Sequence, residues 1–202
     1  MTVLQNKIDF AVVLRVKRAN PNGDPLNGNR PRTDYDNYGE MTDVCNKRKI
    51  RDRLLERWVA DGKKEDDGNM IFVQSDDRKA DQHKSLRSRA EAILGNKLGS
   101  SDTVKLACEK WLDVRAFGQL FALKKKAKKG EDAETDGDTG ISIGIRGPVT
   151  VQSAFSVAPI DITSNQITKS VNGEDTKDGK RSSDTMGTKH RVDHGSMFST
   201  EV

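Results

Sequence analysis

The chain has 202 residues, of which 33% are hydrophobic, 33% charged and 5% aromatic, and its 35 basic residues nearly balance its 31 acidic ones. This length fits one domain with insertions or two very small domains, and the balanced charge differs from the one-sided charge that is typical of disordered chains. Two widely spaced cysteines exclude a disulfide framework, and no apolar run approaches the roughly 20 residues that cross a bilayer, so we expect a soluble cytoplasmic protein with no membrane partner.

The first third of the chain predicts a strand, a loop and a helix. Residues 7–18 alternate between apolar and polar side chains, which is typical of a β-strand. Residues 20–40 contain three prolines, three glycines and two Asn-Gly pairs, and they predict a long irregular loop. Thr42 or Asp43 is the predicted cap of a helix that runs to about residue 60.

The middle of the chain predicts a second group of helices. A short strand is expected over residues 70–74, and helices are expected over residues 81–94 and 102–112. Residues 113–122 are apolar but too short to assign. A lysine-rich run followed by an acidic run predicts a mobile surface loop over residues 123–140.

The last third returns to strand patterns. Residues 141–157 predict a strand with a bend at Gly147-Pro148. Residues 161–183 are polar and contain two further turn signals, so they predict an exposed hairpin that stands off the body of the domain. The mixture of strands and helices, without an internal repeat, indicates the α+β class.

The start of the first helix carries an unusual charge pattern. Lys47, Arg48 and Arg51 share one face of its first turns, where the unpaired backbone amides already present positive charge. Cations at that end are favourable if a phosphate lies among them, so the pattern predicts a phosphate site. The alternative is that these side chains reach solvent or pair with Asp52 and Glu56.

The loop that leads into this helix suits contacts with sugar and phosphate. Asn20, Asn22, Asp24 and Thr42 offer polar side chains, and Gly23 permits close approach of a ligand. An ordinary surface loop is the alternative for these residues.

A second candidate lies at residues 145–153. Arg146 supplies a charge, Gly147 permits a backbone or a ligand to come close, and Gln152 lies on the polar face of the predicted strand. An ordinary surface arginine beside a strand glycine is the alternative.

Residues 184–194 combine apolar and cationic side chains. Met186 beside Lys189 and His190 suits a wedge between bases together with phosphate contacts. The competing interpretation is a metal site made by His190, Asp193 and His194. No third histidine or HExxH-type glutamate stands nearby, so we expect neither a metal nor a cofactor.

Five motifs together resemble a known family. They are NPNGDP at 20–25, TDVCNKRKIRD at 42–52, DVRAFG at 113–118, IRGPVTVQSAFS at 145–156 and DTMGTKH at 184–190. In this order they resemble the Csd/Csh-type Cascade backbone proteins, the Cas-seven family of the RAMP superfamily, and are most similar to type I-C. The resemblance extends over residues 8–198.

This resemblance implies a fold and a set of partners. It implies a single RNA-binding domain over residues 1–202 with an RRM-like (ferredoxin-like) antiparallel sheet, whose C-terminal part is absent from this sequence. Insertions are expected at 61–101, which is helical, at 123–140, the charged loop, and at 161–188, a thumb-like hairpin. The implied partners are CRISPR RNA, the target DNA strand paired to it, copies of the chain in a filament and other Cascade subunits.

The resemblance also implies the role of individual residues. The helix start at Lys47, Arg48 and Arg51 would grip the RNA backbone, and Arg115 of the DVRAFG motif joins the predicted RNA-binding residues. Copies of the chain would display the bases for pairing with target DNA, and the chain itself would not be an enzyme.

Two other functions remain open. One is a RAMP-type metal-dependent endoribonuclease that uses a loop aspartate, Asp24, Asp34 or Asp36, although no carboxylate pair has evident metal spacing and His83 lies in a plain helical segment. The other is a scaffold whose basic helix contacts an acidic protein. Steep salt dependence would distinguish RNA binding from the scaffold.

Overall fold

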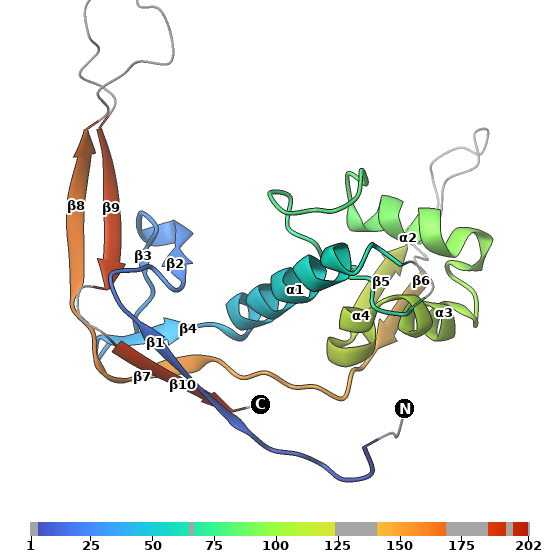
Figure 1. The fold of residues 1–202 in the computed structure, drawn as a ribbon, viewed down its shortest axis with the longest axis horizontal. Helices are drawn as coiled ribbons and strands as arrows, with labels where there is room; N and C mark the ends of the chain where they lie inside the picture. Colours follow the sequence, from blue (N-terminus) through green and yellow to red (C-terminus); the bar gives the residue numbers. More distant parts are fainter. Residues whose placement is uncertain (1–3, 65–66, 124–140, 169–185, 193–195, 202) are drawn as a thin grey trace, which may run out of the picture. The chain divides into compact units, whose positions relative to one another are not determined.

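A computed structural model describes residues 4–64, 67–123, 141–168, 186–192 and 196–201. The chain divides into two compact units: unit 1 comprises Met1–Asn46 and Val151–Val202, and unit 2 comprises Lys47–Thr150. Both helices and antiparallel strands are present, which confirms the α+β class (Figure 1).

A four-stranded antiparallel sheet forms the body of unit 1 (Figure 1). Its strands, in spatial order, are β1 (Ala11–Val16), β10 (Ser196–Glu201), β7 (Ala154–Pro159) and β4 (Tyr38–Met41). Leu14 faces Phe198, and Phe198 faces Ser156 in the next strand. Alternate side chains of β1 turn inward as its sequence predicts, and the buried cluster beneath the sheet contains Met41, Ala154 and Phe198.

The segment predicted to be an irregular loop has more regular structure than expected. Two short antiparallel strands, β2 (Gly23–Asp24) and β3 (Arg30–Pro31), enclose the 3-10 helix η1 (Pro25–Asn27). The Asp24 side chain caps η1 by accepting a hydrogen bond from the Leu26 amide at 3.1 Å. The prolines and glycines of this segment therefore mark the turns of a folded excursion.

A two-stranded ribbon stands beyond the sheet of unit 1. It pairs β8 (Ile162–Thr168) with β9 (Met186–Val192) in antiparallel register, and Figure 1 shows the two strands side by side. The predicted hairpin is thus confirmed, but its second strand is β9 and lies beyond residue 183. The predicted turns at residues 172–173 and 178–179 lie outside the described residues.

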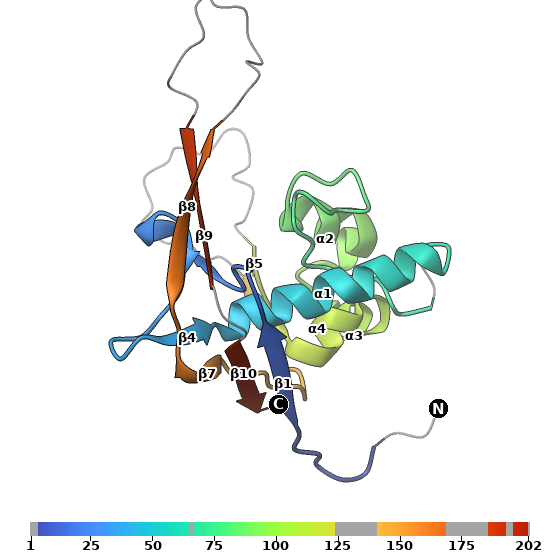
Figure 2. The same cartoon turned by 60° about the vertical axis from the view of Figure 1, so that its left-hand side comes forward.

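Aromatic packing dominates the core of unit 2. Phe72 lies 4.6 Å from Trp111 and 5.2 Å from Phe121, measured between ring centroids. The elements around this core are shown in Figure 2. They are the body of α1 (Asp43–Ala60), α2 (Leu86–Leu94), the 3-10 helix η2 (Gly95–Lys97), α3 (Thr103–Lys110), α4 (Leu112–Phe117), β5 (Gln119–Leu123) and β6 (Ile141–Ile145). No helix in the described part of the chain has the length and apolar content to span a membrane.

Two predicted elements of unit 2 were wrong. Residues 70–74 form no strand: Met70 makes one isolated bridge, while the amides of Phe72 and Val73 bind the Asp113 carboxylate. The helix expected over 81–94 begins only at Leu86, because Ser85 caps it.

The segment around Gly147-Pro148 separates two strands instead of bending one. β6 pairs with β5 in unit 2, and β7 belongs to the sheet of unit 1. A Cβ at Gly147 would lie 2.1 Å from the Ala116 carbonyl oxygen, so the glycine permits backbone packing. Of the predicted charged loop, residues 124–140 lie outside the described residues.

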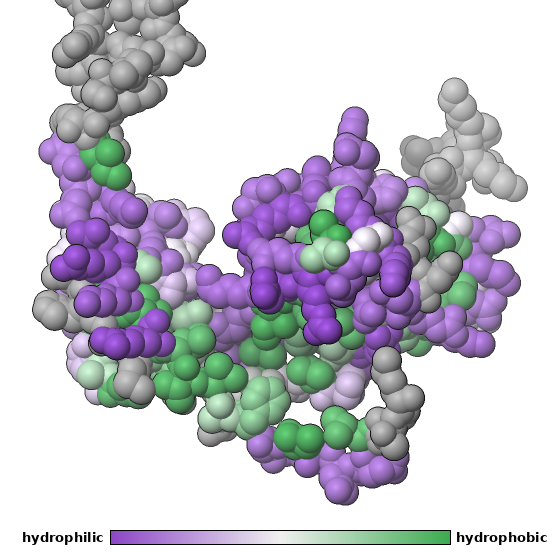
Figure 3. Space-filling model, viewed as in Figure 1, coloured by the Kyte–Doolittle hydropathy of each residue, from purple (hydrophilic) through white to green (hydrophobic). Residues whose placement is uncertain are grey.

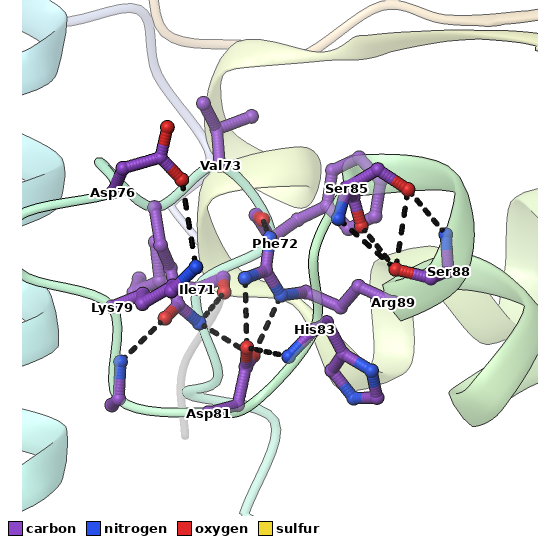
Figure 4. A network of polar contacts seen from close by, with 12 residues as sticks. Ile71, Phe72, Val73, Asp76, Lys79, Asp81, His83, Ser85, Ser88 and Arg89 are labelled. Atoms are coloured by element: carbon purple, nitrogen blue, oxygen red, sulfur yellow. Dashed lines mark hydrogen bonds and ion pairs between the residues drawn. The ribbon is translucent and has the colours of Figure 1, made fainter.

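Asp81 and Arg89 form a polar network that explains why residues 81–85 leave the helical pattern (Figure 4). The Arg89 guanidinium, 4% exposed, donates to both Asp81 oxygens at 2.7 and 2.9 Å and to the Phe72 carbonyl at 2.7 Å. Desolvation alone would raise the pKa of Asp81, but hydrogen bonds from Arg89 and from the His83 amide outweigh it, so that pKa is lowered.

The lowered pKa of Asp81 predicts a pH-dependent contribution to stability. The carboxylate stabilises the fold above its unfolded-state pKa of about 3.9, and this contribution is lost as pH falls through the lower folded-state value. Asp81→Asn should therefore lower the free energy of unfolding at pH 7 and should cost progressively less below about pH 4. Urea denaturation at both pH values measures this; a loss that is equal at pH 7 and pH 3 would contradict it.

Candidate nucleic-acid interface

Asn22 and Thr42 join the loop of unit 1 to the start of α1. The Asn22 Oδ1 atom accepts hydrogen bonds from the Thr42 amide at 2.9 Å and from its hydroxyl at 3.0 Å. The Thr42 Oγ1 atom in turn accepts from the Cys45 amide at 3.2 Å, which makes Thr42 the helix cap. The amide of Asp43 donates to the Ser153 hydroxyl at 3.2 Å. Several backbone amides at the helix start, where a phosphate site was predicted, therefore donate to side chains of the protein itself.

Asn20, Gly23 and Asn29 pack against one another within the same loop. The Asn20 Nδ2 atom donates to the Asn29 carbonyl at 2.7 Å. A Cβ at Gly23 would lie 1.9 Å from Asn29 Oδ1, so the glycine makes room for that side chain. The loop predicted to contact sugar and phosphate is thus held in one shape by its own amides.

Arg48 and Arg51 at the helix start have acidic partners inside unit 2. Arg48 lies 3.0 Å from Asp77 and 3.7 Å from Asp52. Arg51 donates to Asp113 at 3.1 Å, and its guanidinium lies 5.2 Å from the centre of the Phe117 ring. Pairing with acids was one of the two arrangements that the sequence left open.

Asp113 is a residue whose importance the sequence analysis missed. Its carboxylate is fully buried and accepts from the Phe72 and Val73 amides at 2.7 and 3.0 Å, in addition to Arg51. Burial raises the pKa of Asp113, and the two amides and the Arg51 charge oppose that rise. An aspartate inside the short apolar run at 111–117 was the signal available in the sequence.

Arg115 and Arg146 differ in whether their side chains bond to other residues of unit 2. Arg115 donates to the carbonyls of Cys108 at 2.5 Å and Gly68 at 3.0 Å, so it closes a turn of unit 2. Arg146 is exposed and makes no hydrogen bond or ion pair within the described residues. In unit 1, the carbonyl of Gln152 accepts from the buried Asn46 side chain at 3.2 Å.

The β8–β9 ribbon presents polar side chains on both of its faces. Lys189 is exposed opposite Asn165, while the His190 ring nitrogen Nδ1 lies 2.7 Å from the Ser164 hydroxyl. Met186 begins β9. Asp193 and His194, the other members of the alternative metal site, lie outside the described residues; among those that are described, no cluster of three or more His, Cys, Asp or Glu could hold a metal ion.

Positive charge without acidic partners gathers where the ribbon joins the loop. Val192 of β9 donates to the Ala19 carbonyl at 3.0 Å, and β3 packs against β9. These backbone contacts place four cationic residues on neighbouring segments, here named the hairpin-base cluster: Arg18, Arg30, Lys189 and Arg191. Within the described part of the chain none of the four makes an ion pair, and Figure 3 shows predominantly hydrophilic residues over the described ribbon.

Comparison with known proteins identifies the family. Residues 6–201 match the family model described as CRISPR-associated protein Cas7. The chain belongs to the Cas7 family. It is also 29% identical over 169 residues to the CRISPR-associated protein Cas7 of Haloferax volcanii. That alignment covers 80% of the chain and 46% of the archaeal protein, so the chain spans about half the length of this Cas7 relative.

The structure distributes the predicted site residues over both units. Asn20, Asn22, Gly23, Asp24, Thr42, Gln152, Met186, Lys189 and His190 belong to unit 1; Lys47, Arg48, Arg51, Arg115, Arg146 and Gly147 belong to unit 2. RNA contact by each of them stays a prediction. The sequence analysis did not single out Arg18 and Arg30, whose place beside β9 follows from the pairing of Ala19 with Val192 and from the packing of β3 against β9.

Removing the Asp113 carboxylate should destabilise unit 2 strongly. Asp113→Ala leaves Arg51 and two amides without their partner, and breaking a buried pair in this way costs about 3–5 kcal/mol. The matched control is Asp77→Ala, which removes the exposed partner of Arg48 and should cost far less, because exposed ion pairs contribute little to stability. Chemical denaturation compares the two variants; equal losses would contradict the structural role of Asp113.

Proposed function

We propose that the chain binds CRISPR RNA through its sugar-phosphate backbone, without reading its sequence, as the repeated filament subunit of a type I, I-C-like, Cascade complex in antiviral defence. Membership of the Cas7 family and the order of the five motifs support this proposal. The wider assembly proposed here includes the target DNA strand, other Cascade subunits and copies of the same chain.

The hairpin-base cluster is the observation that carries the proposal. Most arginines of unit 2 lie beside an acid, as Arg48, Arg51 and Arg89 do. None of the four cations of the cluster makes an ion pair within the described residues, although Asp24 lies opposite Arg30 in the β2–β3 pair, so much of their positive charge is uncompensated in the isolated chain. A polyanion is the ligand that would compensate this charge, and RNA supplies closely spaced phosphates.

The chemistry around the cluster favours backbone contacts over base recognition. Arginine, lysine and asparagine side chains beside backbone amides are typical of phosphate and sugar contacts, which position a nucleic acid but carry no sequence information. The loop Asn20–Asn29 is held by its own hydrogen bonds, which suits a rigid cradle for a repeating backbone. In this proposal the β8–β9 ribbon is the thumb that folds over the RNA, on an RRM-like sheet.

We propose a second, separate contact with RNA at the helix start of unit 2. The Arg48–Asp77 pair is exposed, and such pairs contribute little to stability, so Arg48 can exchange Asp77 for a phosphate at small cost. Arg51 is 14% exposed and bound to a fully buried carboxylate, so we assign it a positioning role beneath Lys47 and Arg48.

The loop aspartates suit structural roles, and we propose that the chain does not cut RNA. Asp24 caps η1, and Asp34 Oδ1 accepts from the amides of Asp36 and Tyr38 at 3.0 and 2.8 Å. These hydrogen bonds account for Asp24 and Asp34 without a metal ion. They leave the endoribonuclease alternative without a specific observation in its favour.

Salt dependence tests the proposed backbone contacts. The logarithm of the affinity for single-stranded RNA should fall linearly with the logarithm of salt concentration, and each phosphate contact contributes about 0.7 to the slope. Lys189→Gln and Arg30→Gln should each weaken binding to every RNA sequence about equally and reduce the slope by roughly one contact. Fluorescence anisotropy with two RNAs of unrelated sequence measures both effects.

The control for this experiment is a cation of unit 2 that already has an acidic partner. Lys105 lies 3.9 Å from Glu109 on α3, so Lys105→Gln should leave the affinity and the slope unchanged. A strong preference of the unmodified chain for one sequence would contradict backbone recognition. A change of the salt-dependence slope in Lys105→Gln, without a change in the cluster variants, would contradict it as well.

A further inference from the structure

Two buried polar atoms of unit 1 have no hydrogen-bond partner. They are the Arg191 Nε atom at the base of β9 and the Asn20 Oδ1 atom at the start of the loop. Leaving a buried polar group unpaired is costly, and such groups in folded proteins call for an explanation. Both residues are only half-buried, so part of each side chain still lies at the surface.

The backbone pairing places these two residues opposite each other. Ala19 forms an antiparallel bridge with Val192, so the next residue along the loop, Asn20, faces the preceding residue of β9, Arg191. Opposed residues of an antiparallel pair direct their side chains to the same face, with Cβ atoms about 4.5–5.5 Å apart. The unpaired donor and the unpaired acceptor therefore belong to one location.

The orientation of the Asn20 amide is set by its surroundings. Its Nδ2 atom donates to the Asn29 carbonyl at 2.7 Å, which assigns the oxygen to the unpaired position. A guanidinium nitrogen can only donate, and an amide oxygen can only accept. A ligand that satisfies both must therefore accept from Arg191 and donate to Asn20.

This requirement selects one group of an RNA strand. A phosphate oxygen could accept a hydrogen bond from Arg191 but would be repelled by the Asn20 oxygen. An ammonium group could donate a hydrogen bond to Asn20 but could not accept one from Arg191. A hydroxyl does both through one atom, and the ribose 2′-hydroxyl is the group that distinguishes RNA from DNA. We propose that Asn20 and Arg191 together bind a ribose 2′-hydroxyl and so give this chain its selectivity for RNA.

The proposed contact rests on the RNA-binding function proposed above and adds the basis of its selectivity. Beyond its pairing with β8, β9 is bridged to Ala19 through Val192 and packs against β3, so the two atoms lie where the ribbon meets the loop. In this proposal the 2′-hydroxyl supplies their missing partners.

The test compares three strands of one sequence: RNA, DNA, and RNA with 2′-O-methyl groups, which can accept but not donate. The full 202-residue chain should bind RNA more tightly than either of the other two. Arg191→Lys keeps the charge but removes the Nε donor, so it should weaken RNA binding about three- to tenfold more than it weakens DNA binding. The ratio of the RNA and DNA affinities is the measured quantity.

Lys189→Gln is the matched control on the same strand. It removes a phosphate contact, so it should weaken RNA and DNA binding alike and leave their ratio unchanged. If Arg191→Lys lowers both affinities equally, or neither, the 2′-hydroxyl contact is wrong, and a buried water then accounts for the two unpaired atoms. If the unmodified chain binds no RNA at all, the proposed function fails as well. Thermal denaturation of each variant shows whether a loss of binding reflects unfolding.

Discussion

The pairing of cations with acids inside each unit determines which cations are available to bind a ligand. In unit 2 most arginines are paired with acids, as Arg51 is with the buried Asp113 and Arg89 with Asp81. Such pairs hold segments in place and have little charge left for a ligand. In unit 1 none of the four cations of the hairpin-base cluster makes an ion pair within the described residues, although Asp24 lies opposite Arg30, and the cluster lies where β9, β3 and the segment after β1 meet. The proposed RNA interface follows from this difference.

Residues of the NPNGDP and DVRAFG motifs make contacts that hold the fold together. Asn22 fastens the loop to the cap of α1, and Gly23 makes room for Asn29. Asp113 binds two amides and Arg51, and Arg115 closes a neighbouring turn. These residues therefore shape the segments in which they lie, whereas Lys189 is exposed and makes no ion pair within the described residues.

Local patterns predicted the elements that depend on local chemistry. The cap at Thr42, the end of α1 near residue 60, the strand at β1 and the polar hairpin could all be read from neighbouring residues. The failures came from partners distant in sequence. Residues 70–74 give their amides to Asp113, and residues 81–85 leave the helix because Asp81 binds Arg89. Lys47, Arg48 and Arg51 were predicted to surround a phosphate. The prediction did not include Asp77 and Asp113, because a helical pattern does not show which residues from distant segments lie beside the helix.

Photocrosslinking tests most directly whether the uncompensated cations of unit 1 contact RNA. The full chain would be crosslinked to RNA containing 4-thiouridine, and the modified peptides identified by mass spectrometry. The account predicts crosslinks in the peptides that contain residues 15–30 and 186–192, with any RNA sequence. Crosslinks confined to the Lys47–Thr150 unit, or found with only one sequence, would contradict it.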